Sequence, residues 1–451
     1  MPIIFVLGIL AIAFEDKIKI NKAATSIGMC ILLWLMFLID STGIFTAHRP
    51  PNMDNFLIGF PEFAKLTTSE LALRYVEFSI VEALGDVSTT LFFVLASMAI
   101  IEIADTYGAF GVITSSIKSR SKRKLLWIFS IITFGLSALL GDLATVIVMI
   151  AVMRKIIPDA EQRLVYSCMT IIAANAGGAW SPIGDVTTLL LWTGGNISVL
   201  HQVSHLILPS ITMMLVPLLI ITFTFPKDSS IEKVDIQKVE YPEFITPKFQ
   251  KTILYISLAS LALVPVFQSI FNLPPFMGVL LGLVILWAIT DIKNARYKKN
   301  SSEYKVSNLF GKLDISTVLF FLGILMSVQA LKSVGFLTTM SDSINSVISN
   351  SNTIALLLGV CSSFLDNVAL VAASMGMYPI AEAGAFMADG TFWTFLAYCA
   401  VTGGSILIIG SASGVTVMGI EKISFMYYFK KFTILALLGY AAGAGVYLLL
   451  I

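Results

Sequence analysis

Between two long apolar runs the chain reads Ala173-Ala174-Asn175-Ala176-Gly177-Gly178-Ala179-Trp180-Ser181-Pro182-Ile183-Gly184-Asp185-Val186-Thr187-Thr188. Such residues interrupt a membrane helix, because glycine frees the backbone, proline removes a hydrogen-bond donor and aspartate introduces a charge. Inside a bilayer, a break is tolerated only where protein or a water-filled cavity satisfies the freed N–H and C=O groups. The stretch is therefore predicted to be a broken membrane helix and a candidate ion or substrate site. The alternative, a surface loop, is disfavoured because the apolar run resumes at once with Leu189-Leu190-Leu191-Trp192.

The composition is that of a polytopic membrane protein. Of the 451 residues, 57% are hydrophobic and 13% are charged, and the mean hydropathy is +0.88. Soluble domains carry about twice that charged fraction. The net charge of +1 indicates no nucleic-acid partner. The four cysteines lie far apart in apolar segments, so their spacing predicts neither a disulfide framework nor a metal site.

Clusters of lysine and arginine set the predicted topology, because they gather on the cytoplasmic side of a membrane. The most basic cluster lies at residues 118–124, and Arg154-Lys155 follows the next apolar stretch. A single crossing would place one of these flanks outside, whereas a re-entrant hairpin keeps both inside. The hairpin is therefore favoured, with its turn at Gly141-Asp142, where glycine permits reversal and the aspartate lies at membrane depth.

This topology predicts an all-α polytopic membrane protein in four parts. Residues 1–85 contain N-terminal spans and an external segment that includes His48 and Arg49, and residues 86–225 contain a hairpin near 125–157 and a broken helix near 164–190. Residues 226–314 contain a linker, two spans and a basic cytoplasmic loop that includes Lys298 and Lys299. Residues 315–451 contain a hairpin near 352–380, a broken helix near 391–420 and a C-terminal span.

The second half of the chain repeats motifs of the first half in the same order. Ser362 to Asn367 resembles Ser137 to Asp142, and Thr402 to Gly414 resembles the opening stretch, each at a separation of about 225 residues. The flanks of the second hairpin lack lysine and arginine, so this hairpin is predicted to enter the membrane from outside. The halves are therefore predicted to be inverted repeats, with a binding site at their interface near mid-membrane.

Polar residues at the breaks and hairpin tips form the candidate site. Their carboxylate, amide and hydroxyl oxygens suit Na⁺ or Li⁺ better than zinc, which prefers thiol or imidazole ligands. Burial favours the protonated form of a carboxylate, so one site can bind a cation or a proton but not both, and this competition provides exchange. The alternative role for each aspartate is to cap a broken helix. The candidate cation and proton ligands are Asp142, Asn175, Ser181, Asp185, Thr187, Thr188, Asp366, Asn367, Ser405, Ser411 and Ser413, of which Asp142, Asp185 and Asp366 are the expected metal-binding carboxylates. The residues expected to break the helices are Gly177, Gly178, Pro182, Gly403, Gly404 and Gly414.

Two enzyme classes are disfavoured. His201 and His205 have the spacing of a metalloprotease motif, but Gln202 stands where that motif needs a catalytic glutamate. An intramembrane serine hydrolase could use Ser181 or Ser405, yet the predicted topology places all three histidines outside and no lysine at the same depth. The sequence therefore predicts a transporter and no resident cofactor.

The opening stretch resembles the signature of NhaD-type sodium/proton antiporters of the ion transporter superfamily. Asn21-Lys22-Ala23-Ala24, Leu365 to Ala373 and Thr402 to Gly414 resemble the same family, and together these motifs run almost from end to end of the chain. The resemblance implies exchange of Na⁺ or Li⁺ for protons in a bacterial inner membrane. It also implies a homodimer in the lipid bilayer, with the spans at 23–39 and 252–290 as scaffold and the hairpins and broken helices as the moving part.

The sequence departs from the family pattern at the first hairpin tip. Members of the family usually carry Asp-Asn there, as Asp366-Asn367 does at the second tip, whereas this chain has Gly141-Asp142. Either Asp142 reaches the same space from the next position, or one usual carboxylate is missing. A second alternative is an anion carrier of the dicarboxylate or arsenite type from the same superfamily, which is disfavoured because buried negative charges repel an anionic substrate.

Overall fold

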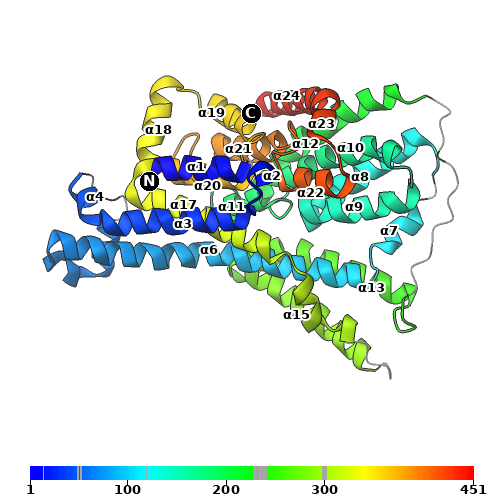
Figure 1. The fold of residues 1–451 in the computed structure, drawn as a ribbon, viewed down its shortest axis with the longest axis horizontal. Coiled ribbons are helices and arrows are strands. Elements are labelled where there is room, and N and C mark those ends of the chain that lie inside the picture. Colours follow the sequence, from blue (N-terminus) through cyan, green and yellow to red (C-terminus); the bar gives the residue numbers. More distant parts are fainter. Residues whose placement is uncertain are drawn as a thin grey trace.

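A computed structural model describes residues 1–13, 15–47, 50, 53–117, 119–226, 231, 241–296 and 302–451. His48, Arg49, Lys118, Lys298 and Lys299, which the predicted topology uses, lie outside the described residues, as does most of the linker after Pro226. In the described part of the chain every named element is a helix (Figure 1). Among the described residues, seven helices are long and apolar enough to cross a membrane, or up to nine if two bent pairs each count as one span. The predicted class, an all-α polytopic membrane protein, is confirmed.

The helices divide at the linker into two sets. The first set is α1 (Pro2–Ala13), α2 (Glu15–Ile18), α3 (Lys22–Ile39), α4 (Ser41–Ala47), α5 (Met53–Gly59), α6 (Thr68–Thr106), α7 (Gly111–Ser116), α8 (Lys122–Leu140), α9 (Asp142–Ile156), α10 (Ala160–Ala179), α11 (Val186–Thr193) and α12 (Val199–Thr224). The second set is α13 (Pro247–Ala262), α14 (Val264–Phe271), α15 (Pro275–Ala295), α16 (Val306–Leu309), α17 (Ile315–Val334), α18 (Phe336–Val347), α19 (Ser351–Cys361), α20 (Asn367–Met377), α21 (Thr391–Gly403), α22 (Ala412–Glu421), α23 (Phe425–Lys431) and α24 (Thr433–Leu450). Short 3₁₀ turns occur at Pro61–Lys65, Ser302–Tyr304 and Phe310–Lys312.

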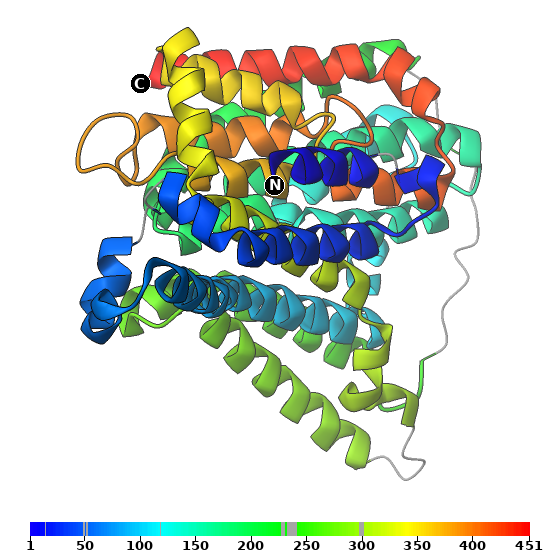
Figure 2. The same cartoon turned by 60° about the vertical axis from the view of Figure 1, so that its left-hand side comes forward.

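The helix α6 is longer than the sequence suggested. It covers 39 residues, because Thr67 and Glu70 form a reciprocal capping box that starts the helix well before the apolar run near Val87. Polar residues in its first turns were assigned to an external segment, since hydropathy marks only the part of a helix that lies in lipid. α6 packs against α15 and α17, and Figure 2 shows α15 diverging from the rest of the bundle.

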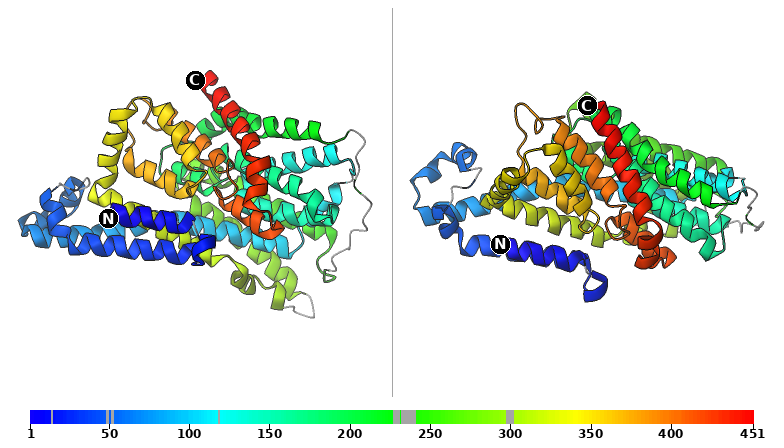
Figure 3. Two further views of the ribbon diagram at one scale, coloured as in Figure 1. Left: turned by 45° about the horizontal axis from the view of Figure 1, so that its top comes forward. Right: turned by 90° about the horizontal axis from the view of Figure 1, so that it is seen from above.

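Two further pairs of helices organise the bundle. α3 packs closely on α17, where a Cβ at Gly323 would meet the backbone of Ser26, and the Trp34 indole donates a hydrogen bond to the Met326 carbonyl (3.1 Å). α12 packs along α24. Figure 3 shows α24 on the outside of the bundle, with the C-terminus at its projecting end.

The two helix breaks have matching contacts. Ser137 Oγ donates to the Ala174 carbonyl (2.6 Å), and Ser362 Oγ donates to the Ala400 carbonyl (2.6 Å), so each hairpin is tied to the helix that follows it. The breaks after α10 and α21 also match, because Gly178 lies against Gly184 as Gly404 lies against Gly410. The internal repeat is therefore visible in contacts, while the opposite membrane orientation of the halves stays a prediction.

The glycines expected to break helices act differently. Gly177 and Gly178 lie inside α10, Gly403 is the last residue of α21, and Gly414 lies inside α22. A Cβ at Gly177 would overlap the carbonyl of Phe134, and one at Gly414 would overlap that of Ile408. These residues thus permit close backbone approach, which is a second use of glycine. Gly403 and Gly404, which end and cap α21, and Pro182, which follows α10, lie where the helices end.

A buried charge cluster joins the first hairpin to the second broken helix. The Glu421 carboxylate at the end of α22 accepts from Arg154 Nε (2.6 Å) and Arg163 Nε (2.9 Å), and its side chain is 1% exposed. Arg163 also donates to the carbonyls of Ile157 and Pro158. The cluster therefore ties the ends of α9 and α22 to the start of α10.

Glu421→Ala is expected to destabilise the fold by about 3 kcal/mol, because the Arg163 guanidinium stays buried without its carboxylate. The measurement is the thermal melting temperature of the purified protein in detergent. Glu77→Ala is the matched control, since its partner Arg74 is exposed and the loss is expected to be below about 0.5 kcal/mol. Equal melting temperatures for the two variants would contradict the expectation.

Candidate functional site

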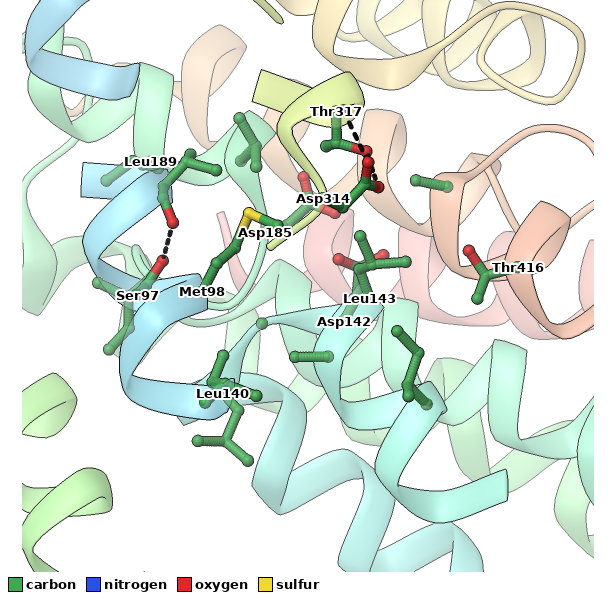
Figure 4. A pocket seen from close by; sticks show the side chains of 18 of the residues that line it. Ser97, Met98, Leu140, Asp142, Leu143, Asp185, Leu189, Asp314, Thr317 and Thr416 are labelled. Atoms are coloured by element: carbon green, nitrogen blue, oxygen red, sulfur yellow. Dashed lines mark hydrogen bonds between the residues drawn. The ribbon is translucent and has the colours of Figure 1, made fainter. Parts of the chain in front are cut away.

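One cavity of about 370 Å³ brings the predicted carboxylates together, and Figure 4 shows two of them, Asp142 and Asp185. Asp142, Asp185, Asp366 and Asn367 line it, so both hairpin tips and the first helix break contribute. Asp142 and Asp185 are only 8% and 6% exposed, whereas Asp366 is half-buried. These predicted residues thus share one space although they lie far apart along the chain.

Each of the three aspartates lies at a helix N-terminus. Asp185 caps α11 and accepts from the Thr187 N–H (2.6 Å), and Asp366 caps α20 and accepts from the Val368 N–H (2.9 Å). Asp142 is the first residue of α9. The helix dipole and the free N–H groups of the first turn favour negative charge at these positions. A cap uses only part of a carboxylate, so capping by Asp185 and Asp366 leaves oxygen atoms that could also bind a ligand.

Contacts between the halves occur at these carboxylates. Asn367 Nδ2 donates to Asp185 Oδ2 (3.4 Å), which joins the second hairpin tip to the first helix break. Asp142 lies close enough to Ser413 and Asp366 to interact with both. Three acidic groups therefore act on one another within a shared cavity.

Asn175 forms the centre of a second polar cluster. Its Nδ2 donates to Ser405 Oγ (2.7 Å) and Ser411 Oγ (3.1 Å), and its Oδ1 accepts from Ser413 Oγ (3.0 Å). All four side chains are buried, and the three serines belong to the second helix break. The Asn175 amide thus joins the two helix breaks, and both its nitrogen and its oxygen are hydrogen-bonded to the serines. These bonds position Ser413 beside Asp142.

The remaining predicted residues divide into two kinds. Ser181 Oγ donates to the Ala138 carbonyl (2.6 Å), and Thr188 Oγ1 donates to the Ser181 and Asp185 carbonyls (both 2.9 Å), so these hydroxyls hold the break in shape. Thr187 Oγ1 is buried beside the Asp185 carboxylate and does not line the cavity.

Thr145 lies one turn after Asp142 on α9, and its Oγ1 is buried without a hydrogen-bond partner in the described residues. It does not line the cavity, so it is not counted among the site residues.

The matching of the hairpins resolves the departure at the first tip. Ser137 and Ser362 make equivalent bonds, so Gly141 is the counterpart of Asp366, and Asp142 is the counterpart of Asn367. Gly141 has φ +84° and ψ 155°, a conformation essentially restricted to glycine. Asp142 therefore reaches the same cavity from the neighbouring position.

The carboxylates do not form one coordination sphere in this conformation. In the described residues no three His, Cys, Asp or Glu side chains converge to hold a metal ion. Asp142, Asp185 and Asp366 line the cavity without sharing one point, so a cation bound there would rely on neutral oxygens as well as on a carboxylate.

The residues considered for enzyme chemistry have other contacts. His201 and His205 stack on each other, with ring centroids 3.9 Å apart, at the start of α12. Ser181 is bonded to a backbone carbonyl, and Ser405 accepts from Asn175. Neither serine is paired with a histidine in these bonds, as nucleophilic catalysis would require.

Comparison with known proteins agrees with a transporter. The sequence model of the CitMHS family, described as citrate transporter, matches residues 5–396. The chain is 38% identical to sodium/proton antiporter 1 of Arabidopsis thaliana, in a match that covers 99% of this chain and 72% of that protein. It is 35% identical to sodium/proton antiporter 2 of the same plant, in a match that covers 99% of this chain and 98% of that protein. It is 28% identical to the Na⁺/H⁺ antiporter NhaD of Vibrio cholerae over 99% of this chain and 91% of that protein. The family and these relatives are transporters and not enzymes. We therefore conclude that the chain belongs to the CitMHS family of membrane transporters and, within it, to the NhaD-type antiporters.

Proposed function

We propose that this protein exchanges Na⁺ or Li⁺ for H⁺ across a membrane. The observation that carries the proposal is the placement of three aspartates, from both halves, at helix N-termini around one cavity. Negative charges held close together in a largely buried cavity repel one another, so the group is stabilised when it gains a cation or a proton. Competition between the two for the same carboxylates gives exchange.

Two cavities support an alternating route to the site. The first reaches from the aspartates to Glu102, Lys312 and Asp314, which are charged groups suited to an aqueous mouth. A second cavity of about 1030 Å³ borders the later turns of α11 and α20, where Thr193 and Met375 line it. In this proposal a change in the position of α11 and α20 transfers the site from one cavity to the other, so that only one cavity is connected to the site at a time.

An anion carrier remains the alternative, because the matching family is described as citrate transporter. Citrate carries several negative charges, and the cavity already holds Asp142, Asp185 and Asp366. Binding an anion there would require all of these charges to be neutralised first. The relatives named as sodium/proton antiporters also favour a cation.

We further propose a bacterial inner membrane and a homodimer as the setting of this activity. NhaD relatives from bacteria support the first proposal, and exposed apolar residues on α15, such as Val284, offer a surface for lipid or a second copy. Membrane fractionation and crosslinking in native membranes would test both.

The function is tested in everted vesicles from a bacterial host that lacks its own sodium/proton antiporters. We expect NaCl or LiCl to collapse a respiration-driven pH gradient in vesicles that contain the protein, and to leave control vesicles without it unchanged. Citrate should produce no response. A response to citrate alone would replace the proposed function by the anion carrier, and the absence of any cation response would refute it.

A further inference from the structure

The cavity that contains the aspartates has a second group of charged side chains at its other end. This group, the mouth of the cavity, consists of Glu102, Asp105, Lys312 and Asp314. The side chain of Lys312 is 51% exposed and that of Glu102 is 24% exposed, whereas Asp142 and Asp185 are buried. Exposure thus rises from the aspartates toward the mouth, so ions from water meet the mouth first.

One face of α6 connects the mouth to the aspartates. Ser97, Ile101 and Asp105 line the cavity at intervals of four residues, which keeps them on one side of the helix. Figure 4 shows Ser97 on the same cavity as Asp185. At about 1.5 Å per residue, Ser97 lies about 12 Å further along the helix than Asp105. A cation in the proposed exchange therefore passes the mouth before it reaches the aspartates.

Lys312 places a positive charge in this acidic mouth. Of the described residues that line the cavity, it alone is basic. Its Nζ lies 3.9 Å from Glu102 Oε1, and Glu102 also accepts from Thr106 Oγ1 (3.3 Å). The backbone at Lys312 is fixed, because a 3₁₀ turn ends there and Asp314 caps α17 by accepting from the Thr317 N–H (3.2 Å). The ammonium group is thus held beside the carboxylate that an entering cation would meet.

We infer that Lys312 controls the entry of the transported cation, because its ammonium group pairs with Glu102 and makes the mouth less negative. The inference rests on the proposed exchange of Na⁺ for H⁺. An entering Na⁺ ion separates the pair, which is weak because both side chains are partly exposed to water. Lys312 acts through Glu102 and is therefore a positioning residue. The net charge of the mouth sets the local concentration of cations, and hence the KM for Na⁺.

The test measures the KM for Na⁺ in everted vesicles at low ionic strength, since the predicted topology turns the mouth toward the added Na⁺. Lys312→Gln is expected to lower the KM by about threefold and Glu102→Gln to raise it by about threefold, because each removes one charge of opposite sign. The double variant restores the net charge, so its KM should return to near the wild-type value. Lys312→Arg keeps the charge and should keep the KM.

Two further variants protect the comparison. Lys312→Met is a second neutral variant, which reports on the charge if Lys312→Gln does not fold. Lys305→Gln is the matched control, because Lys305 is exposed seven residues earlier and does not line the cavity. Its KM should equal that of the wild type.

Ionic strength separates an effect of charge from an effect of structure. Choline chloride at about 1 M shortens the Debye length to about 3 Å, so the KM differences should then disappear. Differences that persist, single variants that shift the KM in the same direction, or an unchanged KM in the neutral variants at low ionic strength would overturn the inference alone. A wild-type protein that responds to neither Na⁺ nor Li⁺ at either ionic strength would instead refute the proposed exchange.

Discussion

Asp185→Asn is expected to abolish cation/proton exchange, with a loss of about 100-fold or more, while the protein still folds. Asparagine is as good an N-cap as aspartate, so α11 keeps its start and the Thr187 N–H keeps an acceptor. What disappears is one of the three carboxylate charges that line the cavity. The substitution therefore separates the capping role from the binding role, and loss of about 3 kcal/mol of cation binding corresponds to that fold-change.

The measurement is the Na⁺-induced collapse of the pH gradient in everted vesicles, normalised to the amount of folded protein. Asp159→Asn is the matched control, because Asp159 caps α10 in the same way but is exposed. The control should retain full exchange. Exchange in Asp185→Asn within a fewfold of wild type would assign Asp185 to capping alone.

Gly403→Ala is expected to prevent the accumulation of folded protein. The added Cβ would overlap the carbonyl oxygen of Gly359, which belongs to α19 and therefore to backbone that cannot rotate away. α19 and α21 pack closely at this point, and separating them would also disturb the bond between Ser362 and Ala400. Overpacking of a buried backbone contact costs about 3 kcal/mol or more.

Gly419→Ala supplies the comparison for this prediction. Gly419 is exposed on α22, and a Cβ there meets no atom within 4 Å. Alanine in an exposed helix position stabilises by about 0.5–1 kcal/mol relative to glycine. Size-exclusion profiles and melting temperatures of the two variants check the expectation, which a monodisperse Gly403→Ala protein of normal stability would disprove.

The local chemistry of the site could be predicted from the sequence, because helix-breaking residues and carboxylates are rare in apolar runs. Asp185 and Pro182 mark the first break by themselves. The hairpin turn at Gly141 follows from charge distribution and from the conformational freedom of glycine. These signals depend on a few adjacent residues, so they need no knowledge of tertiary contacts.

The tertiary relationships could not be predicted in this way. Nothing near Asn175 in the sequence indicates that its amide binds three serines more than two hundred residues away, and nothing near Glu421 identifies its two arginines. Gly177 was predicted to break a helix because its close contact with Phe134 cannot be recognised from the sequence. The domain boundaries, the homodimer and the inverted orientation of the halves stay predictions.

The left-handed backbone at Gly141 decides which position of the first tip can carry a carboxylate. Its φ of +84° excludes a strain-free aspartate at the place where the second hairpin has Asp366, so the acidic group of the first tip stands one residue later, at Asp142. Each tip thus keeps one carboxylate, and the number of acidic groups that the tips offer to the proposed exchange is preserved by shifting one of them along the chain.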